Sequence, residues 1–282
     1  MRRQTKHCAM ALTLMIFWGF LALSPANADS LILPGFNTHA VDKDEVESDE
    51  SEKKTTFIPV DDILAVGVAV GVANAPYIGG DTDWTVWPVV SYEGTYAYIR
   101  GMTAGLKLIN MPYVELSVFL GYDDTELDSA EAEHLLRSRH PGAVMGGEAR
   151  VYTPIGVFAA SASGDISGHS NGFTGSVSYT SSIAFGDLEL DPSIGLVWAS
   201  SKYNDYFYGI NDVEAERLDI NPYQAGSGAA PFFALTAVYS ITEHWGVFFD
   251  GQFRYLEHAV KDSPLVNRTN IYSAVTGVFY AF

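Results

Sequence analysis

The sequence predicts an all-β protein, an antiparallel transmembrane β-barrel of about 12 strands over residues 61–282. From Ile63 to the last residue, apolar side chains alternate with small or polar ones. The alternating segments run for about 10 to 15 residues, as a tilted membrane strand requires, and aromatic residues gather near their ends. Because successive side chains of a strand point to opposite faces, each segment has one apolar face. No stretch after residue 24 is apolar over the roughly 18 residues that a membrane helix needs, so strands must make the crossing.

The composition excludes two classes of protein. Hydrophobic residues make up 48% of the chain and aromatic residues 13%, which is too apolar for a disordered protein. The formal net charge of -18 would be repelled by phosphate backbones, so nucleic acid is not expected as a partner.

Residues 1–28 are predicted to be a secretory signal peptide. A basic start at residues 2–6 precedes the apolar stretch 9–23, and small residues then form a cleavage pattern that ends at Ala28. The alternative, a membrane anchor, is disfavoured because the apolar stretch is short and a cleavage pattern follows it. The single cysteine, Cys8, precedes the apolar stretch, so the mature chain contains none.

Residues 29–60 are predicted to be an acidic, disordered periplasmic leader. Its stretch 42–54 contains Val46 as the single apolar residue and cannot bury a core.

The strand count depends on one segment of the barrel. A single-chain bacterial barrel has an even number of strands, whereas the pattern gives eleven segments. Segment 95–108 carries Gly101 and Gly105 and is the best candidate for a split into two strands, giving twelve; merging two segments would give ten. The segments are 63–74, 84–92, 95–108, 112–122, 142–152, 155–165, 171–184, 188–202, 223–241, 245–258 and 269–282.

The two faces of segment 245–258 show which side meets lipid. Phe249 and Phe253 are assigned to lipid, whereas Asp250 and Arg254 are assigned to the lumen. A soluble β-sandwich also alternates, but its dry core would tolerate such charges poorly. Charged residues of the lumen face could pair with one another, as Glu148 could with Arg150 in segment 142–152.

The last segment places Val278, Tyr280 and Phe282 on one face. A terminal aromatic residue that closes an amphipathic strand resembles the targeting signal of bacterial outer-membrane proteins. We therefore expect the chain to be recognised by the barrel assembly machinery and to reside in outer-membrane lipid.

Several short blocks of residues, taken together with their order and spacing, resemble the MipA/OmpV family of outer-membrane proteins, also called MltA-interacting proteins. The resemblance runs from about residue 63 to 282, and the block Asp205–Ile210 is the most specific. The long acidic leader departs from the pattern. The blocks are residues 65–73, 75–77, 79–80, 87–92, 105–108, 205–210, 214–215, 223–226 and 262–266.

The resemblance implies a non-enzymatic scaffold that links a lytic transglycosylase to a peptidoglycan synthase. Other members of the family look like porins or adhesins, so a small-solute channel or a surface adhesin is the alternative. The channel is also motivated by charged residues assigned to the lumen, namely Glu115, Glu148, Arg150, Asp250 and Arg254.

No catalytic, cofactor-binding or metal-binding residue is predicted, and no cofactor. The histidines after the signal peptide, at positions 39, 134, 140, 169, 244 and 258, have no compact metal-ligand spacing. The stretch 164–170 contains Ser167 and His169 but is not a nucleophile elbow, and neighbouring residues of a hairpin point apart. It is expected to be a plain turn, and a lipid hydrolase is a distant third possibility. Residues 79–83 are likewise expected to be a turn rather than a calcium site.

Overall fold

The computed structural model describes residues 62–78, 82–125, 136–137 and 139–282. The predicted signal peptide (1–28) and acidic leader (29–60) lie outside the described residues, so both remain predictions. None of the described helices has the length and apolarity needed to cross a membrane.

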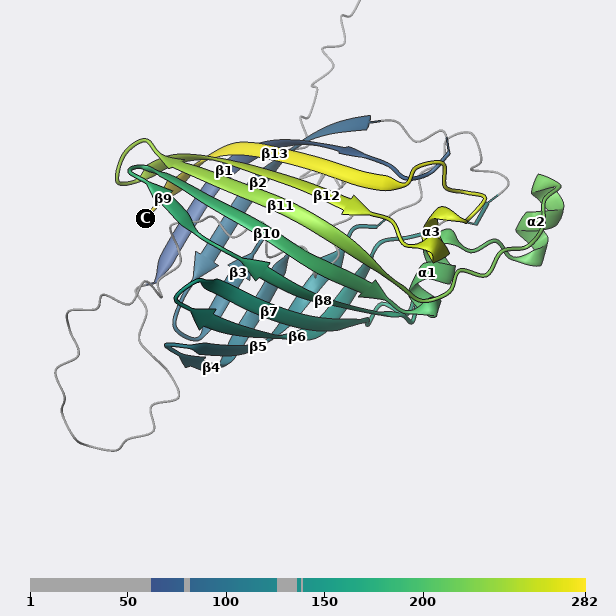
Figure 1. The fold of residues 1–282 in the computed structure, drawn as a ribbon, viewed down its shortest axis with the longest axis horizontal. Coiled ribbons are helices and arrows are strands. Elements are labelled where there is room, and N and C mark those ends of the chain that lie inside the picture. The colour runs from purple at the N-terminus through teal and green to yellow at the C-terminus, as the bar shows by residue number, and fades with distance from the viewer. Residues whose placement is uncertain (1–61, 79–81, 126–135, 138) are drawn as a thin grey trace, which may run out of the picture.

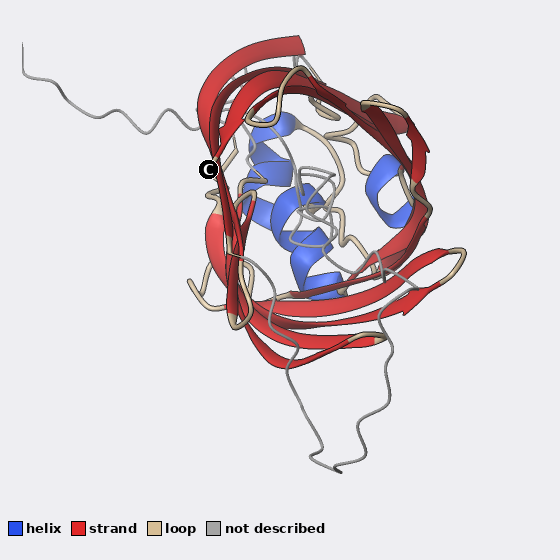
Figure 2. Cartoon of the chain, turned by 90° about the vertical axis from the view of Figure 1, so that its left-hand side faces the viewer, coloured by secondary structure: helices blue, strands red, loops and turns tan. Residues whose placement is uncertain are grey.

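The strands form a closed antiparallel barrel (Figures 1 and 2). Strands that follow one another along the chain pair, except that β8 and β9 both pair with β10, and β13 returns to pair with β1, so the ring of strands is closed. The strands are β1 (Ile63–Asn74), β2 (Thr82–Glu93), β3 (Ala97–Arg100), β4 (Thr103–Met111), β5 (Val114–Asp123), β6 (Gly142–Thr153), β7 (Gly156–Asp165), β8 (Phe173–Thr180), β9 (Ile183–Phe185), β10 (Leu188–Ala199), β11 (Gly228–Ser240), β12 (Trp245–Tyr255) and β13 (Asn270–Ala281).

The barrel has 12 strand positions because β8 and β9 lie end to end along β10. The interruption between them faces Pro192, a residue that has no N–H to give to a neighbouring strand. The predicted count of twelve is therefore confirmed. The predicted split of 95–108 is also confirmed, since the chain reverses between β3 and β4 at Gly101, whose φ of 56° favours glycine.

The face assignment of β12 is confirmed. Phe249 is 43% exposed on the outer surface and Phe253 is similarly exposed, whereas Asp250 is 2% exposed inside the barrel. One of the aromatic residues near the segment ends does not face lipid. Tyr152 has the same strand parity as Glu148 and Arg150, and therefore points inward.

The two ends of the barrel differ. Short turns join the strands at the end where the C-terminus lies, whereas longer connections and all of the described helices lie at the other end (Figure 1). Outer-membrane barrels have short periplasmic turns and long external loops, so the end with the helices is the external one. The helices are α1 (Ser201–Tyr208), α2 (Asp212–Leu218) and α3 (His258–Lys261).

These helices were not predicted. The predicted segment 188–202 extends into α1, and the predicted segment 223–241 begins before β11, in the connection that follows α2. β10 ends at Ala199, and the Ser200 side chain accepts a hydrogen bond from the Tyr203 N–H to begin α1. α2 begins with a capping box between Asn211 and Glu214. Seen along the barrel, the helices lie within the outline of the ring of strands (Figure 2).

Apolar side chains fill part of the interior. They come from β1, β2, β11, β12 and β13 and lie mostly in the half of the barrel near the short turns. The cluster comprises Ala65, Ala69, Ala73, Val89, Val238, Phe248, Val275 and Phe279, with Trp87 packed against it.

Candidate functional site

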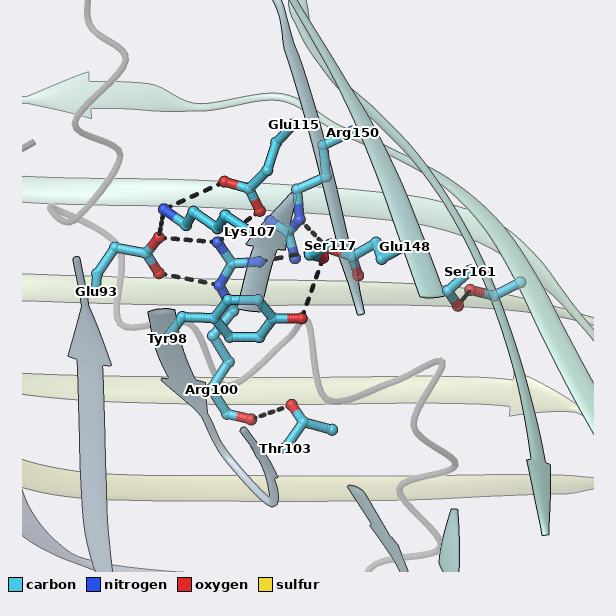
Figure 3. A network of polar contacts seen from close by, with 11 residues as sticks. Glu93, Tyr98, Arg100, Thr103, Lys107, Glu115, Ser117, Glu148, Arg150 and Ser161 are labelled. Atoms are coloured by element: carbon cyan, nitrogen blue, oxygen red, sulfur yellow. Dashed lines mark hydrogen bonds and ion pairs between the residues drawn. The ribbon is translucent and has the colours of Figure 1, made fainter. Parts of the chain in front are cut away.

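The short strand β3 carries the centre of a buried ion network (Figure 3). Arg100, at the end of β3, is 4% exposed and reaches three carboxylates from three other strands. Its guanidinium donates to both oxygens of Glu93 on β2, at 3.0 Å each. It also donates to Glu115 Oε1 on β5 at 3.1 Å and to Glu148 Oε1 on β6 at 3.3 Å.

Two further cations complete the network. The Lys107 ammonium on β4 contacts Glu93 and lies 3.3 Å from Glu115 Oε2. Arg150 Nε donates to Glu148 Oε1. Three cations therefore face three carboxylates, so their formal charges cancel and no external ion is required for neutrality.

An aromatic side chain covers one face of the network. The Arg100 guanidinium lies 4.0 Å from the centre of the Tyr98 ring, and the Tyr98 hydroxyl lies within hydrogen-bond distance of Ser117 Oγ at 3.2 Å. The network thus joins β2, β3, β4, β5 and β6 through side chains.

The structure separates the five lumen residues that the sequence singled out. Glu115, Glu148 and Arg150 belong to the network. Asp250 lies on β12 and accepts a hydrogen bond from Thr236 Oγ1 at 2.8 Å. Arg254 lies near the external end and lines a small cavity of about 30 Å³.

Sequence reasoning missed Glu93, Arg100 and Lys107. Parity along β2 and β4 would have placed Glu93 and Lys107 on the inner face, since the outward neighbours of both are apolar. No local pattern indicates that Arg100 meets Glu148, which lies 48 positions further along the chain.

The external end is closed by a packed cap built from α1, α2, α3 and the adjoining connections. Arg139 and Glu214 form an ion pair at 3.4 Å, with both side chains almost fully buried. Arg139 also donates to the backbone oxygens of Tyr206 at 2.8 Å and Gly209 at 2.6 Å. The apolar side chains around this pair are those of Ala75, Tyr77, Leu136, Phe207, Tyr208, Ile210, Ala215, Ala225, Leu256, Val260, Leu265 and Val266.

The turn 164–170 is organised by one carboxylate. Asp165 accepts hydrogen bonds from the Ser167 N–H at 2.8 Å and from the Ser167 hydroxyl at 2.5 Å. It also accepts one from the Ser170 N–H at 2.7 Å, while His169 Nδ1 contacts the Pro141 backbone oxygen at 2.9 Å. The hydroxyl and the imidazole are therefore each engaged with a different partner.

The structure describes only some of the histidines that the sequence analysis considered. His39 and His134 lie outside the described residues, whereas the rings of His140 and His169 are 5.9 Å apart at the external end. Within the described parts of the chain, no three His, Cys, Asp or Glu side chains converge as a metal site would require.

Known proteins resemble this chain over the whole barrel. The family model described as MltA-interacting protein MipA matches residues 66–282. The putative outer membrane protein YiaT of Escherichia coli O157:H7 is 30% identical over 78% of this chain and 91% of its own length. The MltA-interacting protein of Escherichia coli K12 is 28% identical over 78% of this chain and 90% of its own length. The outer membrane protein OmpV of Vibrio cholerae is 29% identical over 42% of this chain and 46% of its own length. The chain belongs to the MipA family and is an outer-membrane β-barrel.

Proposed function

We propose that this protein is a non-enzymatic scaffold of the outer membrane, whose periplasmic turns bind a lytic transglycosylase and a peptidoglycan synthase. One relative of the chain is named for its interaction with MltA. The filled interior of the barrel is the observation that carries the proposal.

Many of the side chains that point inward, in the apolar cluster and in the ion network, are covered by one another rather than by water. Phe248, Val275 and Lys107 are each nearly inaccessible to solvent, although all lie on inner faces. In a water-filled channel such side chains would be exposed. The ion network and the apolar cluster occupy the half near the short turns, and the cap closes the external end. The interior thus supports a docking role over transport along the axis.

The periplasmic turns offer an apolar surface for a partner. Each short turn has a large apolar residue within it or directly beside it, and all of these side chains are well exposed. Exposed apolar side chains that gather at one end of a molecule mark an interaction surface. They are Tyr96, Tyr113, Ile155, Phe185 and Ile241, with Tyr113 64% exposed.

Affinity capture from crosslinked cell envelopes tests the proposal. The wild-type protein should recover a lytic transglycosylase or a penicillin-binding protein. A triple variant, Tyr113→Ser, Ile155→Ser and Ile241→Ser, should assemble normally and lose that recovery. Loss is expected because apolar contact area disappears from three of the periplasmic turns.

A matched control places the same change at the opposite end. Ile78→Ser, Val213→Ser and Ile220→Ser also remove exposed apolar side chains, but from the cap. This control should retain the partner. If neither enzyme is recovered with the wild-type protein, the scaffold role is wrong.

A small-solute channel is the alternative, and one wall of the barrel favours it. On β7, β8 and β10 the inner face carries hydroxyl side chains, of which Ser161, Thr180 and Ser193 are only partly buried. They bond in pairs, Ser161 with Ser176 at 2.8 Å and Thr180 with Ser193 at 2.9 Å. This wall is therefore the surface along which water could pass.

A further inference from the structure

Among the described residues, backbone pairing between β2 and β3 covers only the end of β2. β2 is paired with β1 over its whole length, from Thr82 to Glu93. On its other edge it is paired with β3 only at Tyr92↔Ile99 and Glu93↔Tyr98. We call the unpaired boundary between residues 82–91 of β2 and the β3–β4 hairpin the seam.

Strand parity shows which backbone groups face the seam. The Gly94 N–H donates to the Ala97 oxygen at 3.0 Å, on the β3 side of β2. Backbone groups of alternate residues in an antiparallel strand point to the same edge. The N–H groups of Trp84, Val86 and Val90 therefore point into the seam.

Pro88 has the same parity, so the N–H that it lacks would also have pointed into the seam. Proline is found in sheets where no neighbouring strand needs its N–H. Its presence in the middle of β2 therefore agrees, from the sequence, with the finding that no described strand pairs with this part of the edge.

An unpaired strand edge inside a bilayer needs an explanation. Unsatisfied backbone groups in hydrocarbon cost several kcal/mol each, and irregular backbone at membrane depth is tolerated where it lines a cavity that water can enter. The seam runs from the external end of β2 at Thr82 almost to the short turn after Glu93, so it spans most of the length of this strand. By this rule the unpaired edge of β2 is expected to line a path between the bilayer and the interior.

Apolar side chains flank the seam on the outside. Trp84 is 72% exposed on β2, and Val86 and Val90 follow it on the same face. On the hairpin side, an open groove of about 340 Å³ is lined mainly by Ile99, Met102, Ala104 and Leu120. An uncharged molecule could lie along these surfaces without losing hydration of a charge.

The inner face of β2 continues this apolar surface. Val89 is buried in the apolar cluster, and Trp87 packs against that cluster while remaining partly exposed. Trp84 and Trp87 thus lie on the same strand, one on the lipid side of the wall and one on the inner side.

We propose that the seam is a lateral entrance, through which uncharged apolar molecules dissolved in the outer membrane reach the barrel interior and bind against Trp87. The network around Arg100 holds the base of the entrance together, because it links β2 to β3 where backbone pairing stops. This inference goes beyond a docking role and does not depend on it.

Tryptophan quenching tests the entrance. Single-tryptophan variants are reconstituted in vesicles of phospholipids with brominated acyl chains, with every other tryptophan replaced by Phe. The variant that retains Trp84 should be quenched strongly, because this side chain faces lipid. The variant that retains Trp87 should also be quenched, because acyl chains reach it through the seam.

The control is an inward tryptophan far from the seam. Phe248→Trp on β12, in a chain without other tryptophans, should be quenched little, since Phe248 is buried behind a fully paired wall. If Trp87 is quenched no more than the tryptophan at position 248, acyl chains do not enter and the proposal is wrong.

Hydrogen exchange provides a second readout that does not require a variant. The amides of Trp84, Val86 and Val90 should exchange about 100-fold or more faster than those of Thr85 and Val89, which face β1. Equal protection of both sets would mean that a further strand occupies the edge, and would overturn the lateral entrance.

Discussion

Removing Arg100 should destabilise the barrel by about 3 to 5 kcal/mol, the cost of breaking a buried ion pair by deleting one partner. Arg100→Met keeps much of the side-chain volume but removes the donors to Glu93, Glu115 and Glu148. Lys107 and Arg150 still contact these carboxylates, so each keeps one cation. The formal charge of the network nevertheless changes from zero to one excess negative charge inside the barrel.

Urea unfolding of the lipid-refolded barrel, followed by tryptophan fluorescence, measures this cost. Glu115→Gln alone should also destabilise the barrel, because it leaves one excess positive charge. The double variant restores neutrality and should be more stable than the sum of the two single effects predicts, by about 0.5 to 3 kcal/mol. Arg217→Met is the control, since Arg217 is exposed on α2, and it should change stability by less than about 0.5 kcal/mol.

Two results would refute this reasoning. A loss below about 1 kcal/mol for Arg100→Met would place the guanidinium in water rather than in a buried network. Strict additivity of the two single variants would mean that Arg100 and Glu115 do not interact.

Three further predictions concern the wall, the cap and the axis. Val68 lies at an exposed outer position of β1. The variant Val68→Arg should lower the free energy of unfolding in urea by about 2 to 4 kcal/mol, because Arg is poorly solvated at the bilayer midplane. A loss near zero would contradict the assignment of this face to lipid. Burial raises the pKa of the Tyr208 hydroxyl to about 12, whereas this pKa is about 10 in the unfolded chain. The neutral hydroxyl therefore contributes fully to the stability of the cap below pH 10, and this contribution is lost as the pH rises to 12. Protease cleavage in the cap should therefore accelerate from pH 10 to pH 12, and Tyr208→Phe should weaken this dependence of the cleavage rate on pH. An unchanged pH dependence in the variant would contradict the role of Tyr208. In planar bilayers the protein should show no stable conductance steps, and regular steps would favour the channel.

Much of the barrel could be predicted because strand parity is a local property. The alternation around Phe249 and Asp250 specifies their faces, since a lipid environment outside and packed polar groups inside select opposite residue types. Gly101 similarly marked the reversal between β3 and β4, because a positive φ favours glycine at one defined position.

The cap and the ion network could not be predicted in the same way. Helix α2 spans seven residues, too few for a periodic pattern, and its clearest sign is the capping box of Asn211 and Glu214. The meeting of Arg100 with Glu148 depends on strand register across the barrel, which parity alone does not specify.

Site-specific photocrosslinking in living cells tests the proposed scaffold role most directly. A photoreactive residue at Tyr113, in the turn between β4 and β5, should crosslink a lytic transglycosylase or a peptidoglycan synthase, identified by mass spectrometry. The same residue at Val213, exposed on α2 at the external end, should crosslink neither enzyme. Crosslinks to a murein enzyme at position 113 alone are the predicted result. Their absence at 113, in cells that assemble the barrel normally, would contradict the account.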